Sequence, residues 1–360
     1  MDNAQLFQSL GLALDAKAYA LGAPQQSGPM TVLPVFGPDA GNAFAPPLSG
    51  LKLGGVKRGY GNVELSNGMP GVAVVPLHMG YIQDGAQNHA LCRSAFLGPG
   101  QRVVFEDACC VQQAQGGFLA DREQWFFVLP LALREDALAL RGHKAFGKLW
   151  PAIAALSARL GFDSRGHLEQ VICRRRPFLT QYQSRFELLD GQTGALFFLR
   201  DRLVGVELAP SADYFREVWF PLVCFCYGTA AMELEQRDGQ ADVVRRAGRK
   251  ALRAETPALV GSEVGAGAAT ADGPEPFPAT DLAGLRRSLA DARWERQRRL
   301  REPLLAAGPE RYNLREEERY LRLRLLTAVG QNLAGQVVQE DGRTVYASLA
   351  ARAAVLRGLN

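Results

Sequence analysis

The stretch from Asp84 to His89 holds the side chains of this 360-residue chain that are best suited to chemistry. Gln87 and Asn88 can each donate and accept hydrogen bonds to a polar ligand, and the imidazole of His89 can exchange a proton or contact that ligand. They fall in an expected loop between strands, where binding and catalytic groups tend to lie. The alternative is a turn set by Asp84 and Gly85, in which the amides satisfy local backbone groups.

Two further amides, Gln112 and Gln113, stand shortly before the glycine pair Gly116 and Gly117. A double glycine beside amides lets a ligand approach the backbone closely. The GxxxxGK[ST] order of a phosphate-binding loop is absent, and glycines also mark ordinary turns. We therefore add Gln112 and Gln113 to Asp84, Gln87, Asn88 and His89 as the candidate ligand-binding residues.

Glu207 is the acid that could serve as a general base. It stands on an expected strand at residues 203–208, where alternation places it on one face with Leu203 and Gly205. If that face borders a cleft, Glu207 and His89 are candidate catalytic residues of a hydrolase or transferase. If that face meets solvent, Glu207 is an ordinary exposed acid. No nucleophile elbow or GxGxxG motif accompanies them in the sequence.

The histidines and cysteines predict no metal site and no cofactor. The four histidines lack HExxH spacing, and the six cysteines form neither CxxC pairs nor a zinc-ribbon pattern. Such cysteines are usually buried thiols of a reducing compartment. Residues 1–20 do not have the regions of a signal peptide, and the apolar runs at 125–133 and 219–227 are too short to cross a bilayer. We expect a cytoplasmic protein without a membrane partner.

Arginines gather at residues 174–176, 243–253 and 282–301. The last stretch holds seven arginines and two acids, with Trp294 among them. Such patches can bind nucleic acid or another polyanion. However, the net charge of the chain is only +4, and an arginine-rich helix commonly presents a solvated face. Polyanion binding therefore stays an alternative, and nucleic acid is disfavoured as the main partner.

The first two thirds of the chain have the texture of a β-rich domain. Short apolar runs bounded by turn residues predict strands at 31–36, 71–77, 101–105 and 124–131. A meander is expected at 185–189, 195–199 and 203–208, and strands this close in sequence must be antiparallel. Helices are expected at 143–160, with a kink or second start at Pro151, and after the N-cap residue Ser211. The inward stripe of the second helix comprises Tyr214, Phe215, Val218 and Leu222, and residues 219–227 should be buried.

The composition changes beyond residue 234. Residues 235–260 form a basic segment expected to be helical, and residues 261–280, with four glycines, three prolines and no Leu or Ile, predict a flexible linker. Residues 281–360 are expected to be helical, because Leu282, Leu285 and Leu289 make a stripe and Asn313 with Glu316 resembles a capping box. Asp341-Gly342 predicts a small hairpin within 337–346. The expected fold is α+β: a mainly antiparallel β domain with packed helices at 12–234, the linker, and a helical C-terminal region.

Two stretches carry a family resemblance. The first runs from Tyr81-Ile82-Gln83-Asp84-Gly85-Ala86-Gln87-Asn88-His89 through Gly98-Pro99-Gly100 to Cys110-Val111-Gln112-Gln113, and the second from 194–198 through 203–208 to Tyr214-Phe215 and Trp219. Together they resemble the bacterial domain family named for its association with ADP-ribosylglycohydrolase (ARG) and rhodanese/phosphatase-superfamily proteins, over roughly residues 12–234. The chain departs from that pattern in having Gln112 where an acid is expected and His89 where a base is expected. The resemblance implies protein partners that act on ADP-ribose or phosphate esters.

Three functions follow as hypotheses. The leading one is an accessory protein that recognises a nucleotide-type ligand such as NAD or ADP-ribose through Gln87, Asn88 and Gln112, beside partner enzymes. The second is a hydrolase or transferase that uses His89 and Glu207, which requires the two side chains to converge on one cleft. The third is polyanion or nucleic-acid binding through the arginine clusters, which requires steep salt dependence.

Overall fold

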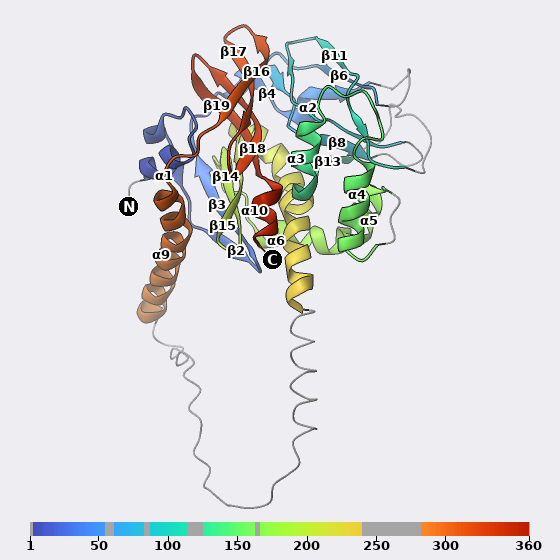
Figure 1. Ribbon diagram of the computed structural model, residues 1–360. Helices are drawn as coiled ribbons and strands as arrows, with labels where there is room; N and C mark the ends of the chain where they lie inside the picture. The colour runs from blue at the N-terminus through green and yellow to red at the C-terminus, as the bar shows by residue number, and fades with distance from the viewer. Residues whose placement is uncertain are drawn as a thin grey trace, which may run out of the picture.

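A nine-stranded antiparallel sheet runs through the centre of the protein in the computed structural model, which describes residues 3–54, 61–82, 87–113, 125–162, 166–239 and 282–359 (Figure 1). The strand order is β1-β3-β14-β15-β19-β18-β17-β16, and β2 also pairs with β3. The sheet therefore combines segments from both ends of the chain. Its strands are β1 (Ala20–Leu21), β2 (Gln25–Ser27), β3 (Met30–Phe36), β14 (Gly194–Leu199), β15 (Arg202–Leu208), β16 (Asn313–Tyr320), β17 (Leu323–Val329), β18 (Leu333–Glu340) and β19 (Arg343–Ala351).

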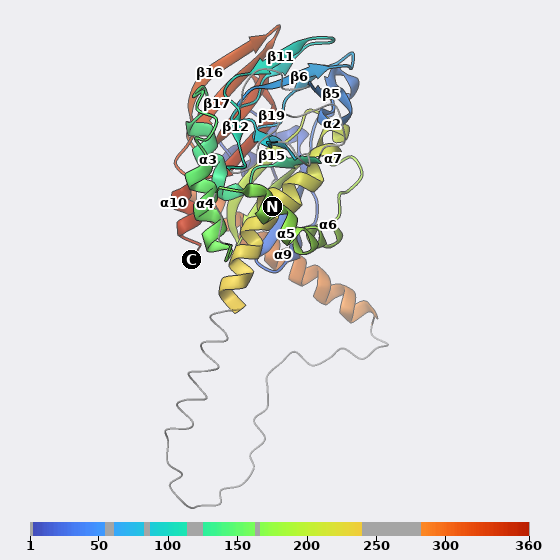
Figure 2. The same cartoon turned by 90° about the vertical axis from the view of Figure 1, so that its right-hand side faces the viewer.

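Three smaller sheets lie together at one end of the molecule, close to β16 and β17 (Figures 1 and 2). Their orders are β10-β7-β4, β11-β6-β5 and β12-β9-β8-β13. The last one carries the candidate segment around His89. The strands are β4 (Phe44–Ala45), β5 (Leu51–Leu53), β6 (Val63–Asn67), β7 (Val72–Val74), β8 (Met79–Ile82), β9 (His89–Ala90), β10 (Phe96–Leu97), β11 (Arg102–Phe105), β12 (Cys109–Cys110) and β13 (Trp125–Val128).

Helices cover these sheets, and the predicted α+β class is confirmed. Within the part of the chain that the structure describes, no helix combines the length and hydropathy needed to span a membrane. The helices are α1 (Asn3–Ser9), α2 (Pro47–Gly50), α3 (Leu131–Ala139), α4 (Trp150–Arg159), α5 (Leu168–Leu179), α6 (Gln181–Arg185), α7 (Ala212–Phe220), α9 (Leu282–Ala307) and α10 (Ala353–Arg357), with short 3-10 turns η1 (Ala16–Ala18) and η2 (Gly41–Ala43).

The helix after Pro210 forms as the sequence predicts. The Ser211 hydroxyl accepts a hydrogen bond from the backbone N–H of Tyr214, at 3.2 Å, and so caps α7. The expected inward stripe is buried, and the helix continues through a π-helical stretch, η3 (Pro221–Tyr227), that is buried throughout. Pro221 lacks an N–H to donate, which favours the irregular bonding at this point. The helix predicted at 143–160 is shorter in the structure: residues 143–149 form no helix, and α4 begins at Trp150 with Pro151 in its first turn.

One strand of the predicted meander is wrong. Residues 185–189 form no strand: α6 ends at Arg185, and β14 pairs instead with β3 on that side. All six residues of β14 are buried, so its neighbour must be apolar on both faces, which suits β3 and not a segment that contains Glu187. The tight reversal between β14 and β15 is confirmed, with Arg200 and Asp201 at φ 48° and 62°.

The helical prediction for the C-terminal region is right for α9 and wrong beyond it, where four strands span residues 313–351. The apolar residues at helical spacing do not share one face, since Leu325 is buried whereas Leu321, in the β16–β17 turn, is 81% exposed. Glu316 caps no helix and binds Arg324 across the strands at 2.8 Å. The hairpin at Asp341-Gly342 is confirmed between β18 and β19.

The C-terminal strands complete the sheet begun by the first half of the chain. β19 pairs with β15 from Gly205↔Ala350 to Leu208↔Ala347. The segment expected to be a linker, 261–280, and most of the basic segment 235–260 lie outside the described residues. Because β19 pairs with β15, buried residues before position 240 and after position 282 belong to one large apolar core.

Candidate functional site

The predicted ligand-binding residues come together at the β9–β12 pair. Cys110 lies opposite His89 in the register, and Gln87 and Asn88 lead into β9. Gln113 is exposed, and Asp84, Gly116 and Gly117 lie outside the described residues. The buried members of this set, which we call the amide cluster, are Gln87, Asn88, His89 and Gln112.

Asn88 and Gln112 hold two chain segments together. The backbone N–H of Asn88 donates to Gln112 Oε1 at 3.1 Å, and the N–H of Val111 donates to the carbonyl of Asn88 at 2.9 Å. Gln112 also forms a β-bridge with His167, which brings the start of α5 to the cluster. These bonds satisfy backbone groups that would otherwise be buried without partners. Asn88 and Gln112 thus position the cluster.

Both ring nitrogens of His89 are engaged by backbone groups. Gly61 N–H donates to Nε2 at 3.0 Å, which leaves Nδ1–H to donate to the carbonyl of Gln87 at 2.8 Å. Burial lowers the pKa of His89 to about 4, against a smaller opposing effect of the bond to Gln87. His89 is therefore a neutral imidazole at pH 7 with no ring nitrogen left to exchange a proton.

This geometry predicts a loss of stability in mild acid. Because the pKa of His89 is lower in the folded than in the unfolded chain, the stabilisation is complete above pH 6.5 and is lost as the pH falls toward 4, by about 3 kcal/mol in all. Burial also lowers the pKa of His78, which acts in the same direction. Urea unfolding of the protein and of His89→Gln at several pH values measures the effect. Between pH 6.5 and 4, the unfolding free energy of the variant should depend on pH less steeply, by the uptake of about one proton on unfolding. An unchanged pH dependence would contradict the assignment of a neutral, buried His89.

An acceptor and a donor in the cluster remain open. Gln87 is 4% exposed, and its Nε2 donates a long hydrogen bond to the carbonyl oxygen of Gln112 at 3.5 Å. Within the described structure, Gln87 Oε1 and the indole Nε1 of Trp150 on α4 are buried without a hydrogen-bond partner. Both side chains face the thiol of Cys110: burial raises the pKa of Cys110 to about 11, while Trp150 and Gln87 act to lower it. Within the described residues, the cluster thus presents the unpaired carbonyl oxygen of Gln87.

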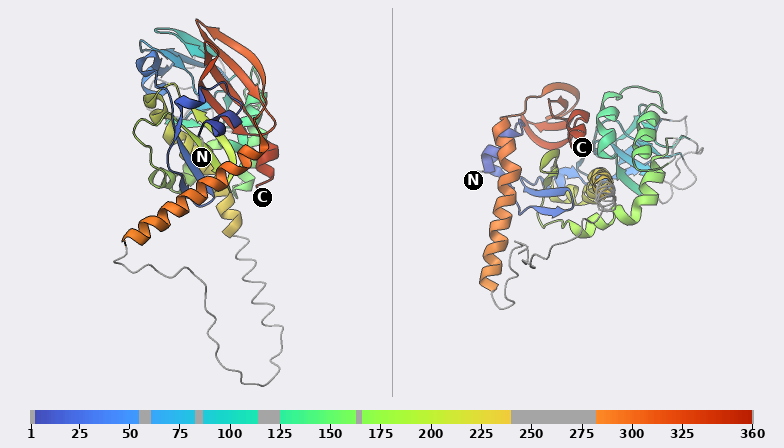
Figure 3. Two further views of the ribbon diagram at one scale, coloured as in Figure 1. Left: turned by 90° about the vertical axis from the view of Figure 1, so that its left-hand side faces the viewer. Right: turned by 60° about the horizontal axis from the view of Figure 1, so that its bottom comes forward.

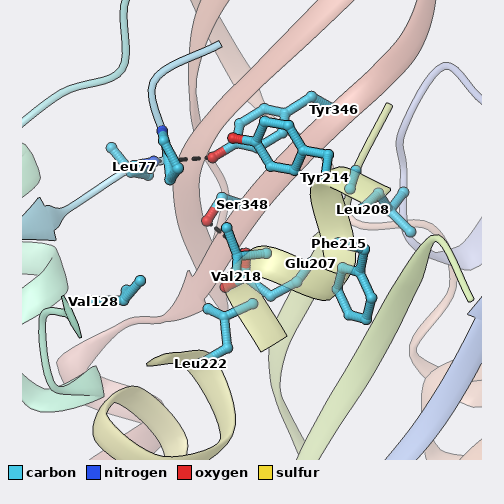
Figure 4. A pocket seen from close by; sticks show the side chains of 12 residues that line it. Leu77, Val128, Glu207, Leu208, Tyr214, Phe215, Val218, Leu222, Tyr346 and Ser348 are labelled. Atoms are coloured by element: carbon cyan, nitrogen blue, oxygen red, sulfur yellow. Dashed lines mark hydrogen bonds between the residues drawn. The ribbon is translucent and has the colours of Figure 1, made fainter. Parts of the chain in front are cut away.

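Glu207, the candidate general base, is held in a buried ion pair. Arg134 on α3 donates to Glu207 Oε1 at 2.6 Å, and the Tyr227 hydroxyl donates to the same oxygen at 2.7 Å. The Ser348 hydroxyl, on β19, donates to Oε2 at 2.6 Å (Figure 4). The expectation of a solvent-facing or cleft-facing acid is therefore wrong, since Glu207 is 4% exposed and both of its oxygens accept hydrogen bonds.

The remaining contacts of Arg134 extend this network. Its Nε lies 3.2 Å from His78 Nδ1, and its Nη2 donates to Ser348 Oγ at 2.6 Å. A cavity of about 20 Å³ adjoins Glu207, Tyr346 and Ser348, which is room for about one water molecule. We call Arg134, Glu207, Tyr227, Ser348 and His78 the buried ion network. The network is buried, and the cavity beside it has room for only about one water molecule. The buried ion network therefore has a structural role and does not bind substrate.

Sequence reasoning missed Arg134 and His78. Arg134 is followed directly by Glu135 and Asp136, so the local pattern reads as an exposed charged turn of helix. The signal that could have found it is Glu207 itself. An acid between Val206 and Leu208, on a strand buried on both faces, requires a cation from elsewhere in the fold.

The two candidate catalytic residues do not form one site. His89 contacts Gly61 and Gln87, Glu207 contacts Arg134, Tyr227 and Ser348, and the hydrogen bonds of the described residues give the pair no shared partner. The described residues also hold no group of three or more His, Cys, Asp or Glu that could bind a metal ion.

A polar groove of about 680 Å³ contains Arg93, Arg141 and Arg315, but Glu317 binds Arg141 at 2.7 Å and lies 3.9 Å from Arg315.

Comparison with known proteins supports the resemblance noted in the sequence. A search of curated proteins and a search of solved structures each found no match. A family model matches residues 18–275, a span that contains the amide cluster, Arg134 and Glu207 but ends before β16–β19. The chain belongs to the family of the ARG and Rhodanese-Phosphatase-superfamily-associated Protein domain.

Proposed function

We propose that this protein is an accessory protein that binds a nucleotide-type ligand such as ADP-ribose or NAD at the amide cluster, beside enzymes that act on ADP-ribose or phosphate esters. The observation that carries the proposal is the buried carbonyl oxygen of Gln87, which has no hydrogen-bond partner in the part of the chain that the structure describes. A buried acceptor without a partner costs about 1–3 kcal/mol, and a ligand that donates to it recovers that energy. The name of the family supports the accessory role, because it records association with ARG and rhodanese–phosphatase proteins.

The chemistry of the open groups favours a nitrogenous base. The exocyclic amino group of adenine and the carboxamide of nicotinamide can each donate to Gln87 Oε1. The ring N1 of adenine can accept from an indole N–H such as Trp150 Nε1. Exposed Gln113 lies beside Gly166, and we propose that it binds the rest of the ligand, as we propose for Asp84.

A thermal-shift comparison of two glutamine variants tests the proposal. In the protein, ADP-ribose at about a hundred times its dissociation constant should stabilise the native state by about 2.7 kcal/mol. Gln87→Met should keep the melting temperature of the free protein or raise it, because it removes an unpaired acceptor, and should abolish the ligand shift. Gln112→Met is the matched control: it breaks the 3.1 Å bond from Asn88 N–H and should lower the melting temperature without ligand.

The ligand panel separates recognition of the base from recognition of phosphate. Inosine diphosphate presents an acceptor and a donor where ADP presents a donor and an acceptor, so it should give a much smaller shift than ADP. Equal shifts with the two nucleotides, or a full shift in Gln87→Met, would rule out reading of the base by the amide cluster. No shift with NAD, ADP-ribose or ADP would rule out the nucleotide-type ligand.

A further inference from the structure

Arg301, on α9, is a buried cation that has no acidic partner among the described residues. It is 5% exposed, its Nη2 donates to Asn3 Oδ1 on α1 at 2.6 Å, and in the described part of the chain its Nε has no hydrogen-bond partner. Burial lowers the pKa of Arg301, but a guanidinium stays protonated at neutral pH. A buried charge with no opposite charge is strongly unfavourable, so Arg301 calls for an anion.

Neighbouring arginines of the same helix have acidic partners. Arg298 binds Glu295 at 2.9 Å and lies 3.7 Å from Glu302, and Arg299 lies 3.8 Å from Glu295. These side chains lie at the surface, where an ion pair matters little. Among the described residues Arg301, the most buried of the three, forms no ion pair. Arg301 is therefore a buried and unpaired charge on α9, the helix that packs on α1 (Figure 3).

A cavity lies at this face. It has a volume of about 240 Å³ and is lined by Arg301, Trp294 and Gln297 from α9, by Asn3 from α1 and by Leu21 from β1. The positions 294, 297 and 301 recur at helical spacing, so one face of α9 presents an aromatic ring, an amide and a guanidinium in a row. The unpaired Nε of Arg301 belongs to this cavity wall.

We propose that the cavity between α1, β1 and α9 binds a small oxyanion, a carboxylate or phosphate carried on a planar ring, with Arg301 holding the anion and Trp294 stacking on the ring. Guanidinium N–H groups match the oxygens of carboxylates and phosphates, and charge-assisted bonds of this kind are about twice as strong as neutral ones. Gln297 adds an amide N–H beside the guanidinium. The volume suits a molecule smaller than a nucleotide.

The test titrates the full chain with phenyl phosphate, benzoate and inorganic phosphate in buffer without other oxyanions, at matched ionic strength set with sodium chloride. Both ring compounds should raise the melting temperature saturably, and phenyl phosphate should bind more tightly than inorganic phosphate. Arg301→Met should weaken binding of phenyl phosphate by roughly ten- to a hundredfold, as loss of a charge-assisted hydrogen bond implies. Arg299→Met, two positions away on the exposed side of the helix, is the control and should bind like the unaltered protein.

A second variant keeps the proposal testable if Arg301→Met does not fold. Trp294 is 56% exposed, so Trp294→Leu should fold and should abolish the preference for phenyl phosphate over inorganic phosphate. Equal stabilisation of Arg301→Met and the unaltered protein, or no saturable response to any of the three compounds, would overturn the proposal. ADP-ribose binding should be unchanged in Arg301→Met and phenyl phosphate binding unchanged in Gln87→Met, so each site can fail independently of the other.

Discussion

Replacing Arg134 with methionine is expected to remove about 3–5 kcal/mol of unfolding free energy, a large share of the 5–15 kcal/mol typical of a folded domain. Arg134 is 1% exposed and lies 2.6 Å from Glu207. Without it, the Glu207 carboxylate keeps the hydroxyl bonds from Tyr227 and Ser348 but loses its only bonded cation among the described residues. Chemical denaturation followed by circular dichroism measures the change.

The matched control is the double variant Arg134→Met with Glu207→Gln. Removing both charges together leaves no uncompensated ion, so the double variant should be more stable than Arg134→Met alone. A double-mutant cycle with the two single variants then gives the coupling between the side chains. If Arg134→Met unfolds at the same denaturant concentration as the unaltered chain, the ion network does not carry the stability assigned to it.

A chain shortened to residues 1–275, the end of the family match, is expected not to fold into a stable monomer. The shortening removes α9 and β16–β19, so β15 becomes an open edge of the central sheet. It also removes Ser348 from Glu207, and the Tyr346 hydroxyl that accepts a hydrogen bond from Leu77 N–H at 2.9 Å. Solubility on expression and the cooperativity of thermal unfolding are the measurements.

A chain shortened to residues 1–352 serves as its control. It keeps β19 and loses only α10 and the last residues, so it should remain soluble and unfold cooperatively. A soluble 1–275 chain with a single sharp unfolding transition would show that the matched span is an independent folding unit, contrary to the expectation.

The sequence predicts those elements whose own residues decide their structure. Ser211 caps α7 because its hydroxyl reaches an N–H three residues away, and Asp341-Gly342 reverses the chain because both residues adopt positive φ. The strands at 313–329 could not be found in this way. Their leucines also fit a helical pattern, and what decides in favour of strands is pairing with β18 and, through it, β19 on β15, contacts that local propensity does not contain.

The candidate site shows the same division. The amides near His89 could be singled out from residue type, but whether they face solvent or the interior depends on Gly61 and Gln112, which lie far from them in sequence. For Glu207 the alternation of side chains is correct, while the partner that decides its role, Arg134, lies 73 positions away. Chemistry that depends on distant pairing is visible only after folding.

The pairing of β15 with β19 has a consequence for how the protein is made in the cell. The ribosome releases β15 more than a hundred residues before β19, which at ~5–20 residues per second leaves β15 without its neighbour for roughly ten seconds. During that time the nascent chain carries an open sheet edge at which the Glu207 carboxylate lacks the hydroxyl of Ser348. Synthesis of this protein therefore passes through a long-lived incomplete state, the stage at which it should depend most on chaperones that shield unpaired strands.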